Sequence, residues 1–284
     1  MAYEISDSIE PAQDIDVEVV ADGHNGVIWG CALTYDAANM TFDIAAGAVL
    51  IDGVVTAVSA QANAETLVAD GTNPRWTLIG LNSSATGVIV SGTAAANPNK
   101  AELGTIKVLL GAVKVEAGQT IANNITTKLD KRIMLRGPYL MQTTSDQILT
   151  QSSSTLQNIT GLGFPVAASS RYKITALVAA LSGTTPDFKV GFTVPASCEV
   201  HFEALYMNTS NAVAMTEMNV SASEVSVQGD GTTANSHEES ALLFGYLITG
   251  ATAGTLQLQA AQNTGDASNT TIKEGSWLEV SKVG

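Results

Sequence analysis

Residues 199–207 read Glu-Val-His-Phe-Glu-Ala-Leu-Tyr-Met, a run in which apolar and polar side chains alternate. Successive side chains of an extended strand point to opposite faces, so a period of two separates a buried face from a solvated one. The face predicted to point inward carries Val200, Phe202, Ala204 and Tyr206. The face predicted to point outward carries Glu199, His201 and Glu203. The run therefore predicts a half-buried β-strand.

Similar runs, bounded by turn residues, fill the rest of the second half of the chain. The expected strands are 155–162, 172–181, 188–194, 212–220, 224–227, 241–249, 255–261, 270–273 and 277–281. Eight or more strands at this spacing, with almost no helix, favour two packed antiparallel sheets, and the strand count favours a jelly roll over an immunoglobulin-type sandwich.

The first half shows the same strand pattern. Its expected strands are 26–34, 41–44, 48–51, 54–59, 75–81, 87–91 and 106–115. Asp52-Gly53 stands between two apolar runs and predicts a tight β-hairpin, because Gly accepts the positive φ of a primed turn. In 106–115, one face is expected to carry Ile106, Val108, Leu110 and Ala112.

The two β-rich halves predict two domains, 1–132 and 152–284, joined by a connector over 133–151. Gly137-Pro138 marks a change of chain direction, and residues 145–150 can form a short helix capped by Ser145 or Thr144. The fold class is therefore all-β, with an N-terminal β-rich domain and a C-terminal antiparallel β-sandwich.

The composition argues against several function classes. Asp and Glu number 27 against 13 Lys and Arg, a net charge of −14, so we expect no nucleic acid as a main partner. The basic residues Lys128, Lys131, Arg132 and Arg136 are interrupted by Asp130, which favours a strand end or a subunit contact.

The sequence contains no recognisable signal peptide, membrane span or cysteine motif. Residues 1–20 include six acidic residues and lack the basic start and apolar run of a signal peptide. No apolar run approaches the length of a membrane span, so no membrane insertion is expected. Cys31 and Cys198 have no Cys or His neighbour at metal-ligand spacing and are expected to be buried free thiols.

No pattern in the sequence predicts catalysis, a cofactor or a metal. His24, His201 and His237 are far apart, and none lies in a nucleophile or metal-ligand motif. The carboxylate pair Glu199 and Glu203 lies on the polar face of its strand, where a solvated pair is expected instead of a glycosidase site, and Glu238-Glu239 is interpreted in the same way. We therefore expect no enzymatic activity.

One polar segment, 227–240, is a candidate partner-contact loop, because loops at the ends of a rigid sandwich often carry binding residues. Its candidate contact residues are Asp230, Asn235, His237 and Glu238. Asp230, Asn235 and Glu238 offer oxygen ligands for Ca²⁺, but their spacing matches no EF-hand, and an ordinary solvated connector is the alternative interpretation. Trp29, Trp76 and Trp277 fall inside expected strands, which favours core packing or a subunit interface over sugar stacking.

The first domain resembles the attachment domain near the N-terminus of phage tail-fibre and baseplate-associated proteins. The resemblance spans residues 26–132 and is carried by the stretches 46–55 (AGAVLIDGVV), 73–79 (NPRWTLI), Gly92-Thr93 with Asn97-Pro98, and 125–132. It implies a domain that docks on the virion and oligomerises.

The second domain is similar to jelly-roll domains at the ends of phage fibres and on phage head decorations. The resemblance spans 155–284 and is carried by 155–162 (TLQNITGL), 164–166 (FPV), 171–174 (RYKI), 254–262 (GTLQLQAAQ) and 275–278 (GSWL). Such domains are commonly trimeric, so the resemblance implies a homotrimer.

Together these features predict a non-enzymatic structural protein of the phage virion, assembled in the host cytoplasm and exposed on the released particle. The leading hypothesis is a trimeric tail or baseplate appendage, whose partners are other virion proteins and a glycan or protein of the host surface. A capsid decoration protein or head fibre is one alternative. A secreted carbohydrate-binding module is another, although no signal peptide supports it.

Overall fold

The chain folds into two compact units, residues 1–135 and residues 136–284. The computed structural model describes residues 25–99, 101–135, 137–183, 186–207, 213–221 and 238–283, with only the main chain at 207 and 213–221. The described part consists of antiparallel strands and one short 3-10 turn, η1 (Ala122–Asn124). The prediction of an all-β chain is confirmed.

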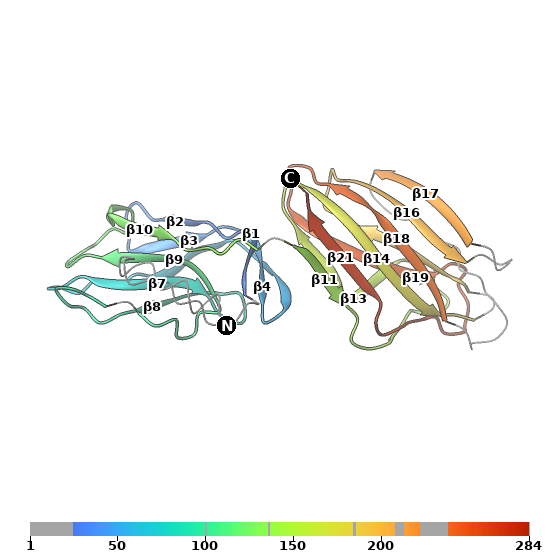
Figure 1. Cartoon of the computed structure of the whole chain (residues 1–284), viewed down its shortest axis with the longest axis horizontal. Helices are drawn as coiled ribbons and strands as arrows, with labels where there is room; N and C mark the ends of the chain where they lie inside the picture. Colours follow the sequence, from blue (N-terminus) through green and yellow to red (C-terminus); the bar gives the residue numbers. More distant parts are fainter. Residues whose placement is uncertain are drawn as a thin grey trace, which may run out of the picture. The chain divides into compact units, whose positions relative to one another are not determined.

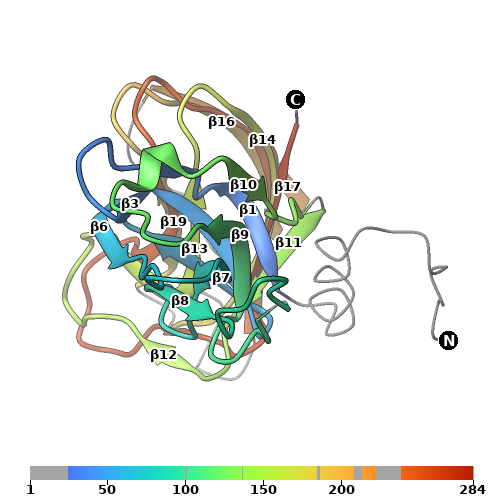
Figure 2. The ribbon, with the colours of Figure 1, turned by 90° about the vertical axis from the view of Figure 1, so that its left-hand side faces the viewer.

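The first unit contains three sheets in its described part, and Figure 2 shows the strands of the largest of them. That sheet has the order β10 (Thr127–Asp130), β9 (Val108–Val115), β7 (Arg75–Leu81) and β8 (Gly87–Ser91). The second consists of β1 (Gly26–Gly30), β4 (Gly47–Ile51) and β5 (Val54–Val58). The third consists of β2 (Leu33–Tyr35), β3 (Thr41–Ile44) and β6 (Gln61–Thr66).

The predicted hairpin at Asp52-Gly53 is confirmed. Ile51 pairs with Val54, and the two residues between them have positive φ angles of 50° and 81°. Two consecutive positive φ values are the signature of a type I′ turn, whose twist matches that of the flanking strands.

Strand β9 is buried on both faces, which the alternation in its sequence did not predict. Its register with β7 shifts so that Gly111 pairs with Ile79 while Leu109 pairs with Gly80, leaving Leu110 as the extra residue of a bulge. After the bulge, even-numbered residues point to the face that odd-numbered residues occupy before it. Leu110 therefore packs in one hydrophobic cluster and Ala112 in the other, so the single face expected over residues 106–112 is wrong.

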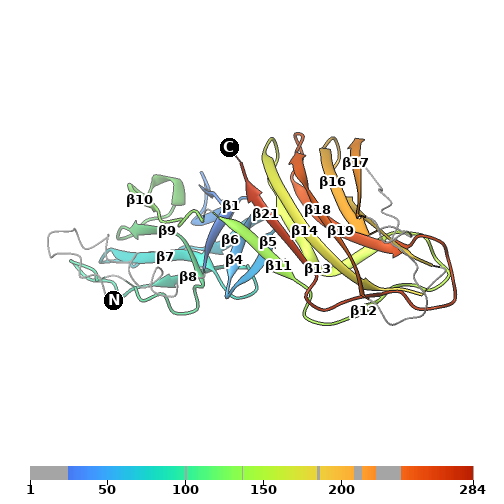
Figure 3. The same cartoon turned by 45° about the vertical axis from the view of Figure 1, so that its right-hand side comes forward.

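The second unit is a sandwich of two sheets, labelled in Figure 1. Its large sheet has the order β11 (Pro138–Gln142), β21 (Trp277–Lys282), β14 (Arg171–Leu181), β18 (Glu238–Ile248), β16 (Glu199–Met207) and β17 (Val213–Ser221), and also includes β12 (Gln147–Ile148) and β20 (Thr271–Ile272). Its small sheet consists of β13 (Gln157–Val166), β19 (Gly254–Gln262) and β15 (Phe188–Thr193). Figure 3 shows β21, β14, β18, β16 and β17 side by side.

The strand order follows that of a jelly roll. Eight strands taken in chain order are β11, β13, β14, β15, β16, β18, β19 and β21. Numbered one to eight, they fill the large sheet as 1-8-3-6 and the small sheet as 2-7-4. The fifth strand, β16, pairs with the sixth and not with the fourth, and β17 extends the large sheet beyond it.

The interior of the second unit lies between the two sheets. The Phe164 ring on β13 stacks on Tyr139 of β11 and meets Tyr172 of β14 edge-on, with centroid distances of 5.5 and 6.1 Å. Gly245 on β18 leaves space for the neighbouring strand, because a Cβ there would lie 2.0 Å from the carbonyl oxygen of His201. The side chains of the large sheet that alternate with these buried ones point away from the small sheet.

Residues expected in the connector belong to the sandwich. Residues 138–142 form β11, whose Tyr139 and Met141 are buried, and 147–148 form β12. The short helix expected over 145–150 is wrong. Its β-branched Ile148 instead pairs with Thr271 of β20, so tertiary pairing outweighs the weak local helix signal.

Candidate functional site

The loop predicted to contact a partner lies mostly outside the described residues. Asp230, Asn235 and His237 all fall there. Glu238 is described. It is the exposed first residue of β18 and pairs with Leu181 at the end of β14.

The acidic pair singled out in the sequence lies on the outward side of the large sheet. Glu199 and Glu203 are outward residues of β16, and His201 between them stacks on Tyr246 of β18 at 4.8 Å between ring centroids. The His201 Nε2 atom lies 3.9 Å from Glu199 Oε2. Within the described ranges, no three His, Cys, Asp or Glu residues gather as a metal site.

One outward surface of the second unit has an apolar centre, and we call it the large-sheet face. It is defined by the outward side chains of β21, β14, β18 and β16. On β18 these include Leu242, Phe244, Tyr246 and Ile248, with Glu238 and Ser240 at the start of the strand. Phe244 and Tyr246 are 36% and 47% exposed, although they lie at the middle of the sheet. An aromatic pair in that position is a mark of an interaction surface.

An apolar row crosses the large-sheet face from one strand to the next. The strand pairing places Leu242 between Leu177 of β14 and Leu205 of β16, and Leu177 is flanked in turn by Trp277 of β21. All four side chains are partly exposed. Trp277 therefore lies in a strand, as expected, and contributes its ring to this outward row.

The opposite outward surface, the small-sheet face, is polar. Its outward residues on β13, β19 and β15 include Asn158, Thr160, Gln257, Gln259, Lys189 and Thr193. The Gln257 side chain donates hydrogen bonds to the carbonyl oxygens of Ile159 and Leu162, at 3.0 and 3.1 Å. These carbonyls belong to the stretch of β13 where the register with β19 shifts, so Gln257 compensates for an interrupted ladder.

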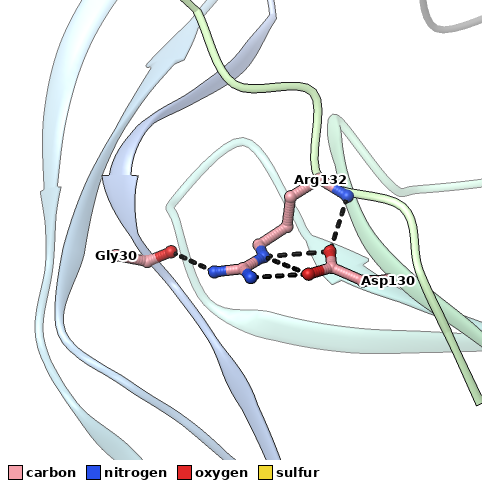
Figure 4. Close-up of polar contacts among 3 residues, drawn as sticks. All are labelled: Gly30, Asp130 and Arg132. Carbon is pink, nitrogen blue, oxygen red and sulfur yellow. Dashed lines mark hydrogen bonds and ion pairs between the residues drawn. The ribbon is translucent and has the colours of Figure 1, made fainter.

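Two members of the predicted basic cluster, Lys128 and Arg132, have contacts at the end of β10, whereas Arg136 lies outside the described residues. The Arg132 guanidinium donates from Nε to both Asp130 oxygens at 3.0 and 3.1 Å, and from Nη1 to the Gly30 carbonyl oxygen at 2.8 Å (Figure 4). These charge-assisted hydrogen bonds from Arg132 hold the pKa of Asp130 below its ordinary value. The next residues run beside β1, where Val27 donates its N–H to the carbonyl oxygen of Ile133 at 2.8 Å.

A half-open hollow of about 210 Å³ lies next to Arg132. Lys128 borders it, donates to the Asn123 carbonyl oxygen at 2.6 Å and lies 4.9 Å from the centroid of the Tyr35 ring. Burial, and then the charge of Asp130, raise the pKa of Tyr35 to about 12, so its hydroxyl stays neutral at physiological pH. Both Lys128 and Arg132 thus have structural contacts within the first unit, as the strand-end interpretation of the cluster predicts.

The predicted state of the cysteines is confirmed, since Cys31 and Cys198 are both buried and free. Burial raises the pKa of the Cys31 thiol to about 11, against a smaller opposing effect of Arg132. A thiol that remains protonated and buried is unreactive.

The large-sheet face was not predicted, although the sequence contains a signal of it. Residues 241–248 read ALLFGYLI, so this strand is apolar on both of its faces. A strand that is apolar on both faces is typical of a sheet covered on both sides. The small sheet covers one side of β18, and the other side is the large-sheet face.

Comparisons with known proteins identify no family. No protein-family model matches the chain, and no curated protein matches it. A structure of the Gx strain of infectious bursal disease virus matches with 10% identity over 91% of this chain and 75% of the other, at a TM-score of 0.15. The VP2 subviral particle of that virus matches with 9% identity over 92% and 76%, at 0.14.

A third match is the mosquito-larvicidal Cry4Aa toxin of Bacillus thuringiensis, with 9% identity over 91% of this chain and 53% of the toxin, at a TM-score of 0.19. Two of the three structures are thus viral. Similarities of this size carry no argument about the function of this chain. No helix among the described residues is long and apolar enough to cross a membrane.

Proposed function

We propose that this chain is a non-enzymatic structural protein of a bacteriophage particle, a homotrimeric surface appendage of the tail or baseplate. The first unit docks on other virion proteins. The jelly roll of the second unit projects toward the host surface, where a glycan or protein is its ligand. This assignment rests on the resemblance of both domains and on the surface properties of the second unit.

The observation that carries the proposal is the large-sheet face. Exposed apolar surface is unfavourable in water by roughly 25 cal/mol per Å², so a contiguous apolar face is retained where a partner covers it. Glu199 and Glu203, the carboxylates considered for a glycosidase, lie on this outward sheet face in the rows of Ile248 and Phe244. A surface of this kind supports assembly better than catalysis.

Gold-labelled antibodies against residues 155–284 test the proposal on purified particles of the phage that encodes this chain. Label on the tail or baseplate is the expected result. Label confined to the capsid would replace the tail appendage with the head fibre or decoration protein. If purified particles carry no label and contain no peptides of the chain by mass spectrometry, the virion assignment is wrong.

A further inference from the structure

The charged residues of the large-sheet face are sorted by strand. Arg171 and Lys173 lie on β14, whereas Glu199 and Glu203 lie on β16. Strand β18 separates the two pairs. Its Ile248 pairs with both Arg171 and Glu199, which places the three residues in one row across the sheet.

The next row continues this arrangement. Tyr246 of β18 lies between Lys173 and His201, and in the row after it Phe244 lies between Thr175 and Glu203. Glu279 of β21 flanks Thr175 on the far side, one strand beyond the cations. The centre of the face is therefore an apolar strand with a cationic flank on one side and an anionic flank on the other.

Over the rows of Ile248, Tyr246 and Phe244 these three central strands are electrically balanced, whereas the chain as a whole is not. In these rows two cations face outward on β14 and two anions on β16, and the outward Glu238 lies at the other end of β18. The net charge of the chain is −14. Two copies of so acidic a chain repel each other over most of their surface. They can approach where the local charge is balanced and the opposite signs can be brought together.

We propose that the large-sheet face is where copies of this chain meet, packed around an axis that runs parallel to β18. The inference rests on the proposed function and names the surface through which its oligomer forms. In this interface, Arg171 and Lys173 of one copy form ion pairs with Glu199 and Glu203 of the next copy.

The pairing follows from symmetry. When copies turn this face toward an axis parallel to β18, the β14 flank of one copy lies beside the β16 flank of the next, at the same height along the axis. Arg171 then meets Glu199 of the neighbouring copy, because both residues occupy the row of Ile248. A two-fold and a three-fold axis both give this pairing. In both cases the apolar row that contains Leu242 packs on the same row of the neighbouring copies.

The charge pattern favours a second copy over a different partner. Another protein would need an apolar strip between an anionic and a cationic flank in the reversed order, and rotation of the same chain supplies that order directly. The size falls within the range of specific interfaces. A face of four strands averaging about nine residues covers roughly 600 Å² at ordinary strand dimensions, so two copies bury about 1,200 Å² in total, at the lower end of that range.

Charge reversal tests the interface through the mass of the purified full-length chain, measured by light scattering after size exclusion. Wild type is expected to be a trimer at micromolar concentration. A dimer that the charge reversals dissociate would keep this interface and overturn the homotrimer. Arg171→Glu with Lys173→Glu makes both flanks acidic, and Glu199→Lys with Glu203→Lys makes both flanks basic. Each double variant is expected to lose association at least 100-fold, because like charges then face each other. The quadruple variant, in which the flanks exchange their signs, is expected to recover the wild-type mass.

Lys189→Glu with Thr193→Glu on the small-sheet face is the control, and it should keep the wild-type mass. Circular dichroism and thermal unfolding verify that every variant is folded. An oligomer whose mass is the same in all variants would overturn this interface while leaving the homotrimer in place. A quadruple variant that stays monomeric would overturn the charge pairing. A monomeric wild type would remove both the interface and the trimer, whereas gold labelling tests the place on the virion independently.

Discussion

The two outward faces of the second unit are supported by the same interior but meet solvent with different side chains. On the small-sheet face, the Gln259 amide donates a hydrogen bond to the Asn158 side chain, and the Gln257 amide donates to the main chain. On the large-sheet face, Phe244 and Tyr246 stand exposed beside a row of leucines. The polar groups of the small-sheet face find hydrogen-bond partners within one chain. The large-sheet face exposes apolar area that only a partner can cover.

This difference shows that the two sides of one strand can be apolar for different reasons: one side packs inside the chain, and the other is available to a partner. The same alternation that directs Leu243 and Leu247 of β18 into the sandwich directs Leu242 and Phe244 out of it.

The largest effect is expected from the interior that both faces share. Phe164→Ala removes a fully buried ring that contacts Tyr139 and Tyr172. The lost contacts and the cavity should lower the free energy of unfolding by about 3–5 kcal/mol. Urea unfolding of the purified chain, at one fixed protein concentration, measures this loss of unfolding free energy. A loss below about 1 kcal/mol would contradict the packing of the two sheets described here.

A smaller loss is expected within the small-sheet face. Gln257→Leu leaves the carbonyl groups of Ile159 and Leu162 without their donor, which should cost about 1–3 kcal/mol. Gln259→Leu is the matched control, because its amide donates to the Asn158 side chain in an exposed setting. The two urea midpoints should differ, with Gln257→Leu the lower. Equal midpoints would mean that Gln257 does not support the interrupted ladder of β13.

Apolar substitutions on the small-sheet face should remove its difference from the large-sheet face. Thr193→Leu combined with Gln259→Leu places two leucines on outward positions of β15 and β19. The fold should persist, and the chain should form larger complexes or precipitate at lower concentration, since it now has two uncovered apolar faces. Light scattering over a concentration series detects this. Unchanged mass and solubility would show that two leucines are not enough to make the small-sheet face associate.

The smallest effect concerns Asp146, which lies away from both faces in the turn after β11. Its carboxylate accepts hydrogen bonds from the Lys273 ammonium and from the Glu274 N–H, and these hold its pKa below the ordinary value of 3.8. A lowered pKa stabilises the fold above pH 3.8, and this contribution is lost as the pH falls through the lower folded value. Asp146→Asn should therefore lose less stability than wild type between pH 7 and pH 3 in urea titrations. Identical slopes would show that the Asp146 pair does not contribute.

Much of the strand content could be predicted from the sequence, because the period of two is a local property. The ranges 41–44, 75–81, 87–91 and 199–207 match β3, β7, β8 and β16 at both ends. Strand β11 was hidden, since its alternation is only five residues long and follows Gly137-Pro138, a turn signal. The bulge in β9 was hidden as well, because a register shift depends on the partner strand.

The candidate surface could be predicted only in part. Glu199, His201 and Glu203 were correctly assigned to an outward face, since alternation separates the two sides of one strand. That β18 stands between β14 and β16 could not be deduced, because residues 238–248 are separated from both strands by long stretches of chain. Without that order, Arg171 and Glu199 are unrelated charges and not the two flanks of one face.

The all-β class, the hairpin at Asp52-Gly53 and the two sides of a strand without a bulge could be predicted from residue order, because they depend on backbone geometry within a few residues. The jelly-roll strand order, the bulge in β9, and the joining of Trp277, Leu177, Leu242 and Leu205 into one apolar row depend on the folded chain. Side chains from distant segments become neighbours only through hydrogen bonds between strands, and the register of those bonds is set by the packing of the whole sandwich.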